Sequence, residues 1–188
     1  DNDQLIFKKE IKRHLKSNTN IIITSGAVSA GKFDFVPGII KKFKLANFFK
    51  SVAIRPGKPI LFSKFKNTNI AFFGLPGNPI SSAACFRFFV FPFLFTSLNI
   101  KKEKPFKAKL KNVFIKKKEF TRFIKGKISF SNKGLVEFEV LGGQESFRIN
   151  SFTQANSWGF FPSGKSKFEK GQFIDCFTVL PYDEMLIN

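Results

Sequence analysis

The sequence has few of the residues on which metal and redox chemistry usually depend. It contains one histidine, one methionine, one tyrosine, one tryptophan and two cysteines in 188 residues. Cys85 and Cys176 lie far apart and in no CxxC pattern, so we predict neither a zinc cluster nor a redox pair. The single methionine is Met185, from which we expect the chain to begin inside a longer gene product.

Acidic residues are also scarce, with 13 Asp and Glu against 32 Lys and Arg and a net charge of +19. Such a charge is typical of proteins that bind nucleic acid or acidic surfaces. The basic runs at 101–104 and 116–118 are short, however, and lack regularly spaced aromatic residues that could stack on bases. Because 29 Phe accompany the lysines, we attribute this composition to A/T-rich codons and expect no nucleic-acid partner.

Long apolar runs are missing as well. The run at 86–98 is interrupted by Arg87 and Pro92 and is shorter than a membrane span requires. No secretory signal is recognisable, and the two cysteines suit a reducing compartment. We therefore expect no membrane partner and a cytoplasmic location.

Strand-like and helix-like segments alternate in the first half of the chain, which predicts an α/β fold there. The expected helices are 5–15, 35–43 and 80–91, and the expected strands are 21–24, 51–54, 60–62 and 70–73. After Leu98 the pattern changes to short alternating runs at 107–115, 123–130, 134–140 and 173–180. These runs predict a small all-β barrel or sandwich. We place one domain at 1–100 and a second at 101–188.

Three loops carry the chemistry of the first half. The segment 24–31, TSGAVSAG, puts small hydroxyl groups and backbone N–H groups at the carboxyl end of a strand, where open α/β sheets bind ligands. An ordinary strand-to-helix turn has the same composition. Asp34 follows, and its carboxylate suits Mg²⁺ beside a phosphate or a hydrogen bond to a polar heterocycle, with a helix N-terminal residue as the alternative interpretation.

The other two loops are stiffened by proline. In RPGKP, at 55–59, Arg55 and Lys58 flank a fixed corner that suits an oxyanion, although a lone pentapeptide of this kind is more often a surface turn. In GLPGNP, at 74–79, glycine lets a ligand approach the backbone, proline fixes the path, and the next helix offers its N-terminus to an anion. Asn78 there also suits simple turn stabilisation.

In this order the segments resemble one family, the molybdopterin molybdenumtransferases, which include the E domain of gephyrin. The resemblance is carried by TSGAVSAGKFDF at 24–35, VAIRPGKP at 52–59, GLPGNPISS at 74–82 and GGQESFRINSFTQANSWGFFP at 142–162. It runs through nearly all of the chain. It implies part of a three-layer molybdopterin-binding α/β domain followed by a small all-β barrel domain.

The resemblance also implies a reaction. Molybdate is inserted into adenylylated molybdopterin with Mg²⁺ assistance and release of AMP, and the full-length family member is a homodimer. Since the first strand-helix unit of the domain and the preceding domains of the family are missing from this sequence, we expect the 188 residues alone to be inactive. A non-catalytic molybdopterin-binding protein, a scaffold and a nucleic-acid binder are the alternatives.

Site roles follow from the resemblance position by position. It implies catalytic roles for Asp34, Arg55, Pro76 and Pro79, and metal binding by Asp3 and Asp34, with Asp1 as a substitute for Asp3. It implies substrate binding by Asp3, Thr24, Ser25, Gly26, Ser29, Gly31, Lys58, Gly77, Asn78, Lys125 and Ser146.

The sequence departs from the family pattern at several of these places. A lysine is usual at Arg55 and Ser51, and the nearest lysine to Ser51 is Lys50, on what should be the opposite face of a strand. Lys125 replaces an arginine, so bidentate recognition is lost unless Arg122 substitutes. Ala27 and Glu145 each replace a glycine, and Glu145 brings a carboxylate to an anion site.

Overall fold

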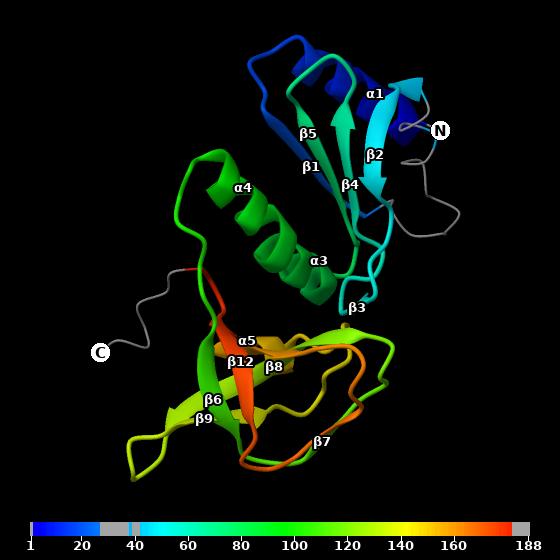
Figure 1. Ribbon diagram of the computed structural model, residues 1–188. Coiled ribbons are helices and arrows are strands. Elements are labelled where there is room, and N and C mark those ends of the chain that lie inside the picture. Colours follow the sequence, from blue (N-terminus) through cyan, green and yellow to red (C-terminus); the bar gives the residue numbers. More distant parts are fainter. Residues whose placement is uncertain (1, 27–37, 39–41, 182–188) are drawn as a thin grey trace. The chain divides into compact units, whose positions relative to one another are not determined.

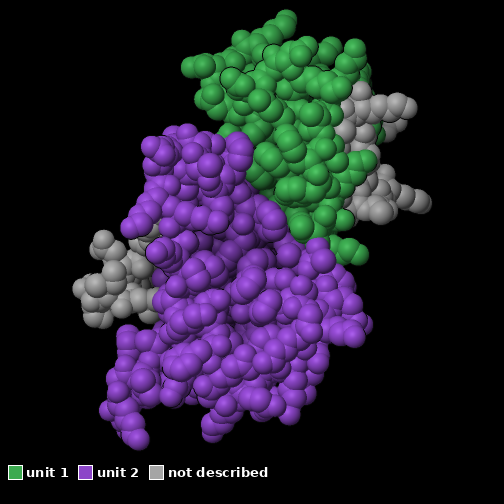
Figure 2. Space-filling view, viewed as in Figure 1, with its two compact units in different colours: residues 1–52, 57–78 green, residues 53–56, 79–188 purple. Residues whose placement is uncertain are grey.

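The computed structural model describes residues 2–26, 38 and 42–181, without the side chains of residues 2 and 3. The chain forms two compact units, which Figure 2 colours separately. Unit 1 contains residues 1–52 and 57–78, and unit 2 contains residues 53–56 and 79–188. Each is described by itself.

Unit 1 is a helix on a mixed sheet (Figure 1). The helix α1 is Asn2–Leu15, and the strands lie in the order β1-β5-β4-β2: β1 is Ile21–Ser25, β5 is Ala71–Leu75, β4 is Leu61–Phe65 and β2 is Leu45–Phe49. Strands β1 and β5 are parallel, and the other pairs are antiparallel. Ile11 of α1 packs with Phe65 and Phe72 of the sheet, which explains the helical spacing of apolar residues in 5–15.

One strand prediction fails, and one strand of unit 1 was not predicted. Residues 51–53 are not in a strand, and the strand of this region, β3, is only Ile54–Arg55. The expected placement of Lys50 and Ser51 on opposite strand faces is therefore wrong, and both residues are exposed in the turn after β2. Strand β2 itself was not expected, because LANFF lacks the alternation that marks a half-buried strand. The helix expected at 35–43 lies largely outside the described residues.

The helix expected at 80–91 is longer than predicted. It consists of α3 (Pro79–Cys85), a π-helical turn η1 (Phe86–Val90) and α4 (Phe91–Ser97). In the π turn the Phe91 N–H donates to the Phe86 carbonyl, one residue further back than in an α-helix. Pro92 follows and has no N–H to give, so this is where the α-helical pattern breaks.

This helix corrects the expectation that no apolar segment reaches the length of a membrane span. Its 19 residues, Pro79–Ser97, have a mean hydropathy of 1.5, so by length and composition alone the helix could cross a membrane. A single helix of this kind is weak support for a span, since core helices of water-soluble domains meet the same criterion. The Arg87 guanidinium is buried on it, paired with Glu103 at 2.8 Å and donating from Nε to the Thr178 carbonyl at 3.1 Å.

The rest of unit 2 is a five-stranded barrel (Figure 1). Its strands are β6 (Phe106–Leu110), β8 (Thr121–Phe130), β9 (Val136–Val140), β10 (Ser157–Phe161) and β12 (Phe173–Thr178). They lie in the order β10-β12-β6-β9-β8, and pairing of β8 with β10 closes the ring. The short β3 extends the sheet beside β8, and β7 (Phe114–Ile115) pairs with β11 (Lys167–Phe168). The helix α5 (Asn150–Thr153) precedes β10.

The barrel interior is filled by aliphatic and aromatic side chains. Phe138 and Phe161 are fully buried there, with Ile124 and Leu110 around them. Both cysteines are free and fully buried, and desolvation raises the pKa of each thiol to about 12. Neither thiol is therefore a nucleophile near neutral pH.

Candidate active site

Two of the predicted loops meet at one edge of the sheet in unit 1. Strands β1 and β5 are parallel neighbours, with Ser25 opposite Leu75, so their carboxyl ends lie together. The Gly26 N–H donates to the Leu75 carbonyl at 3.0 Å, which joins the start of the loop after Ser25 to the end of β5. The residues that lead into both loops are thus side by side.

Glycine makes this meeting possible. Gly26 has φ +77°, and a Cβ added at Gly77 would lie 3.3 Å from the Gly26 Cα. The two backbones therefore approach more closely than most side-chain contacts allow. The predicted role of glycine in GLPGNP, close approach of a ligand, stays a prediction. Pro76 is buried beside this contact, Asn78 is half-buried, and Pro79 is the first residue of α3.

The hydroxyl groups at the end of β1 differ in their surroundings. Thr24 Oγ1 donates a long bond, 3.5 Å, to the Phe73 carbonyl of β5, while Ser25 is exposed. Ser29, Gly31, Asp34 and the departure Ala27 lie outside the described residues, as does the side chain of Asp3. The predicted metal ligands therefore stay a prediction, and no cluster of three or more potential metal ligands occurs in the part of the chain that is described.

The RPGKP loop divides between the units. Arg55 ends β3, which runs parallel to the start of β8 and places Arg55 opposite Arg122. Its exposed guanidinium lies 4.6 Å from the centre of the Phe120 ring, a cation–π contact. Lys58 is exposed in unit 1, where its carbonyl accepts from the Val52 N–H at 3.1 Å.

Lys125 is buried in unit 2 and points at a loop backbone. It is 1% exposed, and its ammonium donates to the carbonyls of Gly143 at 2.8 Å, Arg148 at 3.2 Å and Glu145 at 3.3 Å. Its three N–H donors are therefore used in holding the loop 142–149. Desolvation lowers the pKa of Lys125. Its assignment as a substrate ligand stays a prediction.

The loop held by Lys125 contains the other predicted barrel residue, Ser146, which is half-buried. Gln144 fastens the same loop, because its amide nitrogen donates to the Lys125 carbonyl at 2.7 Å and its oxygen accepts from the Lys125 N–H at 3.0 Å. Glu145, which was expected to bring negative charge to an anion site, forms an exposed ion pair with Arg148 at 3.4 Å.

Sequence reasoning missed most of one basic pocket in unit 2. The pocket has a volume of about 190 Å³ and is lined by Arg55, Lys117, Phe120 and Arg122. Arg55 was predicted as a site residue, Arg122 only as a substitute, and Lys117 and Phe120 not at all. The available signal was weak: two basic residues, Lys117 and Arg122, lie on either side of Phe120 in one short segment.

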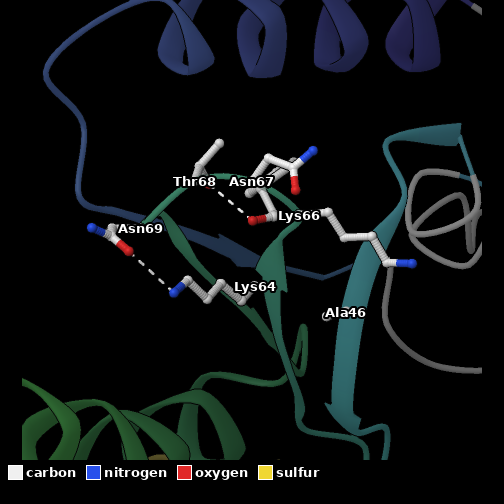
Figure 3. Close-up of a pocket in the computed structure, with 7 residues that line it drawn as sticks. Ala46, Lys64, Lys66, Asn67, Thr68 and Asn69 are labelled. Carbon is white, nitrogen blue, oxygen red and sulfur yellow. Dashed lines mark hydrogen bonds between the residues drawn. The ribbon is translucent and has the colours of Figure 1, made fainter.

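A larger hollow in unit 1 is formed by a hairpin turn. Its volume is about 420 Å³, and it lies at the turn between β4 and β5 (Figure 3). Lys64 Nζ donates to Asn69 Oδ1 at 3.2 Å, and Thr68 Oγ1 donates to the Phe65 carbonyl at 3.0 Å and accepts from the Ile70 N–H. These polar groups satisfy one another, as expected for a hairpin turn.

Comparison with known proteins identifies the family. Residues 1–96 match the family model described as "Probable molybdopterin binding domain", and residues 107–180 match the model described as "MoeA C-terminal region (domain IV)". The chain belongs to the molybdopterin molybdenumtransferase family. A molybdopterin molybdenumtransferase of Haemophilus influenzae is 30% identical over 174 residues, which cover 91% of this chain and 42% of that protein.

Other molybdopterin molybdenumtransferases are similar to a comparable degree. That of Synechocystis is 29% identical over 90% of this chain and 41% of the relative, and that of Staphylococcus aureus is 32% identical over 90% and 39%. The chain therefore spans about two fifths of the length of these relatives, by the shares of 39% to 42% just given.

Solved structures of the family have the same fold. The molybdopterin biosynthesis MoeA protein of Pyrococcus horikoshii has a TM-score of 0.68 at 20% identity, over 93% of this chain and 39% of that one. A molybdenum cofactor biosynthesis protein of Pyrococcus furiosus has a TM-score of 0.67 at 16% identity, over 90% and 52%. The predicted fold class, an α/β domain followed by a small β barrel, is confirmed.

The exact domain boundary stays a prediction in this molybdenumtransferase-family chain. The two family models leave residues 97–106 between them, and the predicted boundary at 100 falls there. The compact units separate earlier in the sequence, with the helix Pro79–Ser97 assigned to unit 2.

Proposed function

We propose that the protein acts in molybdenum cofactor biosynthesis as a molybdopterin molybdenumtransferase. In this reaction molybdate is inserted into the dithiolene of adenylylated molybdopterin and AMP is released. The observation that carries the proposal is the meeting of the 24–26 and 74–78 segments at the carboxyl edge of the parallel pair β1–β5, in a chain of this family. Close backbone approach there, at Gly26 and Gly77, suits the binding of a phosphorylated ligand by N–H groups.

Within this proposal one group of residues binds molybdopterin and another binds molybdate. Thr24, Ser25, Gly26, Ser29 and Gly31 line the molybdopterin side, and Gly77 and Asn78, with Pro76 and Pro79, form a stiff wall on the molybdate side. Lys58, Arg55 and Ser146 supply positive charge and hydrogen-bond donors for oxyanions. Lys125 contributes through the loop that carries Ser146, because its ammonium donates to three carbonyls of that loop. Asp3 and Asp34 would hold Mg²⁺, because carboxylate oxygens are its preferred protein ligands.

The proposal extends to the whole protein. We propose a cytoplasmic homodimer with no membrane or nucleic-acid partner, and we expect the 188 residues by themselves to lack turnover. Buried Arg87, paired with Glu103, supports packing of the apolar helix against protein and not lipid.

If this function is correct, substitutions in the site should lower turnover without lowering the stability of the fold. In the full-length protein, Pro76→Ala and Asp34→Asn should each lower molybdate-dependent AMP release by roughly tenfold or more, because misplacement of reacting groups costs rate steeply. The thermal midpoint should change little for either variant. Pro105→Ala, at an exposed position outside the site, is the matched control and should keep full turnover. Full turnover in both site variants would remove the assignment of this pocket.

A further inference from the structure

We propose that Lys125 and Gln144 are positioning residues for Ser146, and that this arrangement requires an ammonium, not a guanidinium, at position 125. This role rests on the proposed function, in which Ser146 binds an oxyanion of the substrate. It goes beyond that function because the arginine usual in the family at position 125 would then be the wrong residue for this chain. The contacts between strand β8 and the loop 142–149 carry the proposal.

Ser146 lies in a turn whose two ends are held by one ammonium. The Arg148 N–H donates to the Glu145 carbonyl at 3.1 Å, which closes the turn around Ser146. The carbonyls of Glu145 and Arg148 also accept from Lys125 Nζ, at 3.3 Å and 3.2 Å. The Gly143 carbonyl accepts from the same ammonium at 2.8 Å. Lys125 therefore fixes the beginning of the loop and both ends of the turn that carries Ser146.

The direction of these carbonyls decides where the donors of Ser146 point. In a trans peptide the C=O group and the N–H group that follows it point to opposite sides. Because the Glu145 carbonyl is directed at Lys125, the Ser146 N–H is directed away from Lys125. Among the described residues, neither this N–H nor the hydroxyl of half-buried Ser146 has a hydrogen-bond partner. The turn thus offers two donors from one residue, which suits an oxyanion.

Gln144 fastens the same loop to β8 independently of the ammonium. Its Nε2 donates to the carbonyls of Lys125 and Leu141, both at 2.7 Å, and its Oε1 accepts from the Lys125 N–H at 3.0 Å. Both amide hydrogens are therefore used in holding backbone, and none is left to bind a substrate. We infer that Gln144 acts on the reaction only through the position of the loop.

An ammonium suits this place better than a guanidinium. Lys125 is 1% exposed, so the larger, planar end of an arginine side chain would have no empty space to enter. The three donors of an ammonium spread like a tripod toward three carbonyls, whereas the donors of a guanidinium lie in one plane. Desolvation lowers the pKa of Lys125, and the Glu145 carboxylate opposes this shift. The two departures from the family pattern, at 125 and 145, therefore fit one another.

Direct contact of Lys125 with the substrate is the alternative, and it predicts a different result for one variant. A guanidinium binds an oxyanion through two parallel hydrogen bonds, so Lys125→Arg should preserve or improve a direct ligand. If Lys125 positions the loop, the same change should displace the loop and lower turnover. Lys125→Arg in the full-length protein therefore separates the two roles.

Hydrogen exchange of the full-length protein without substrate tests the positioning role. Lys125→Arg and Gln144→Ala should each speed exchange in a peptide covering 142–149 by roughly tenfold or more, because bonds that close the loop are lost. Lys127→Arg is the matched control on the same strand, because Lys127 is exposed and forms no ion pair among the described residues. Gln154→Ala is the control for Gln144, since Gln154 is exposed. Both controls should exchange like the unchanged protein.

Kinetics of AMP release supply a readout that a purely structural role would not change. Lys125→Arg should lower turnover by about tenfold, because misplaced donors stabilise the reacting groups poorly. The loss should fall on the same constant, kcat or KM, as the loss in Ser146→Ala. Combining Lys125→Arg with Ser146→Ala should add little, because both changes remove one interaction.

Unchanged exchange in Lys125→Arg and Gln144→Ala, with full turnover in Lys125→Arg, would overturn the proposal and make Lys125 a direct ligand. Additive losses in Lys125→Arg and Ser146→Ala would also overturn it while keeping the transferase. Faster exchange in both loop variants without AMP release by the unchanged protein would reject the transferase and keep the hold on the loop. If Lys125→Arg does not fold, Gln144→Ala gives the same comparison of exchange, turnover and additivity with Ser146→Ala.

Discussion

Replacement of Gly126 by alanine should destabilise unit 2 by about 3 kcal/mol, the upper part of the usual range for an overpacked core. A Cβ at this position would lie 2.0 Å from Cζ and 2.2 Å from Cε2 of the Phe138 ring. The ring cannot withdraw easily, because Phe138 is fully buried and the same Cζ also lies against Gly159, where an added Cβ would be 2.6 Å from it. Chemical denaturation followed by Trp158 fluorescence measures the loss.

Two further variants make this prediction specific to the ring contact. Gly142→Ala is the matched control, because no atom lies within 4 Å of its added Cβ, and it should change the unfolding free energy by less than about 0.5 kcal/mol. Phe138→Leu in the Gly126→Ala background should restore part of the lost stability by making room. A Gly126→Ala protein as stable as Gly142→Ala would show that the barrel is packed differently.

Glu103→Gln should cost about 3 kcal/mol, because it removes one partner of a buried ion pair. Arg87 and Glu103 form two contacts of 2.8 Å, with side chains 5% and 16% exposed. The remaining guanidinium would stay buried, with the Thr178 carbonyl and an uncharged amide as acceptors. Equilibrium unfolding of the two proteins measures the difference.

The surface pair Lys111–Glu139 provides the control for the Glu103 result. Its contact is 3.1 Å, but its side chains are 37% and 43% exposed, so Glu139→Gln should cost less than about 0.5 kcal/mol. Addition of Arg87→Met to Glu103→Gln should recover stability, because the unpaired charge is then gone. If Glu103→Gln costs no more than Glu139→Gln, Arg87 is solvated and the buried pair does not anchor the helix Pro79–Ser97.

Sequence reasoning found those parts of the fold whose local patterns agree with their tertiary setting. The apolar run 70–73 became the wholly buried strand β5, and the turn chemistry of GLPGNP marked the change from strand to helix. The strands that were missed lack an alternation of apolar and polar residues. Strand β10, SWGFF, is buried at four of its five residues and so shows no alternation, and β2 has none either.

The candidate site was predictable only in part, for a similar reason. Glycine and proline mark places where the backbone needs unusual freedom or stiffness, so both loops could be singled out from the sequence. The close approach of Gly26 to Gly77 depends on the pairing of β1 with β5 and was not predicted. The roles of charged side chains depend on neighbours distant in sequence. Lys125 looks like an anion ligand until the loop carbonyls that surround it are known, and Arg122 gains interest only from its pairing with Arg55.

Release of AMP from adenylylated molybdopterin, with and without molybdate, tests the central claim most directly. The assay compares the full-length protein with the 188 residues alone. Molybdate-dependent release by the full-length protein, and none by the 188 residues, is the predicted result. No release by a folded full-length protein would contradict the transferase, and would favour a non-catalytic molybdopterin-binding or scaffold protein altered at Ser51, Lys125 or Glu145.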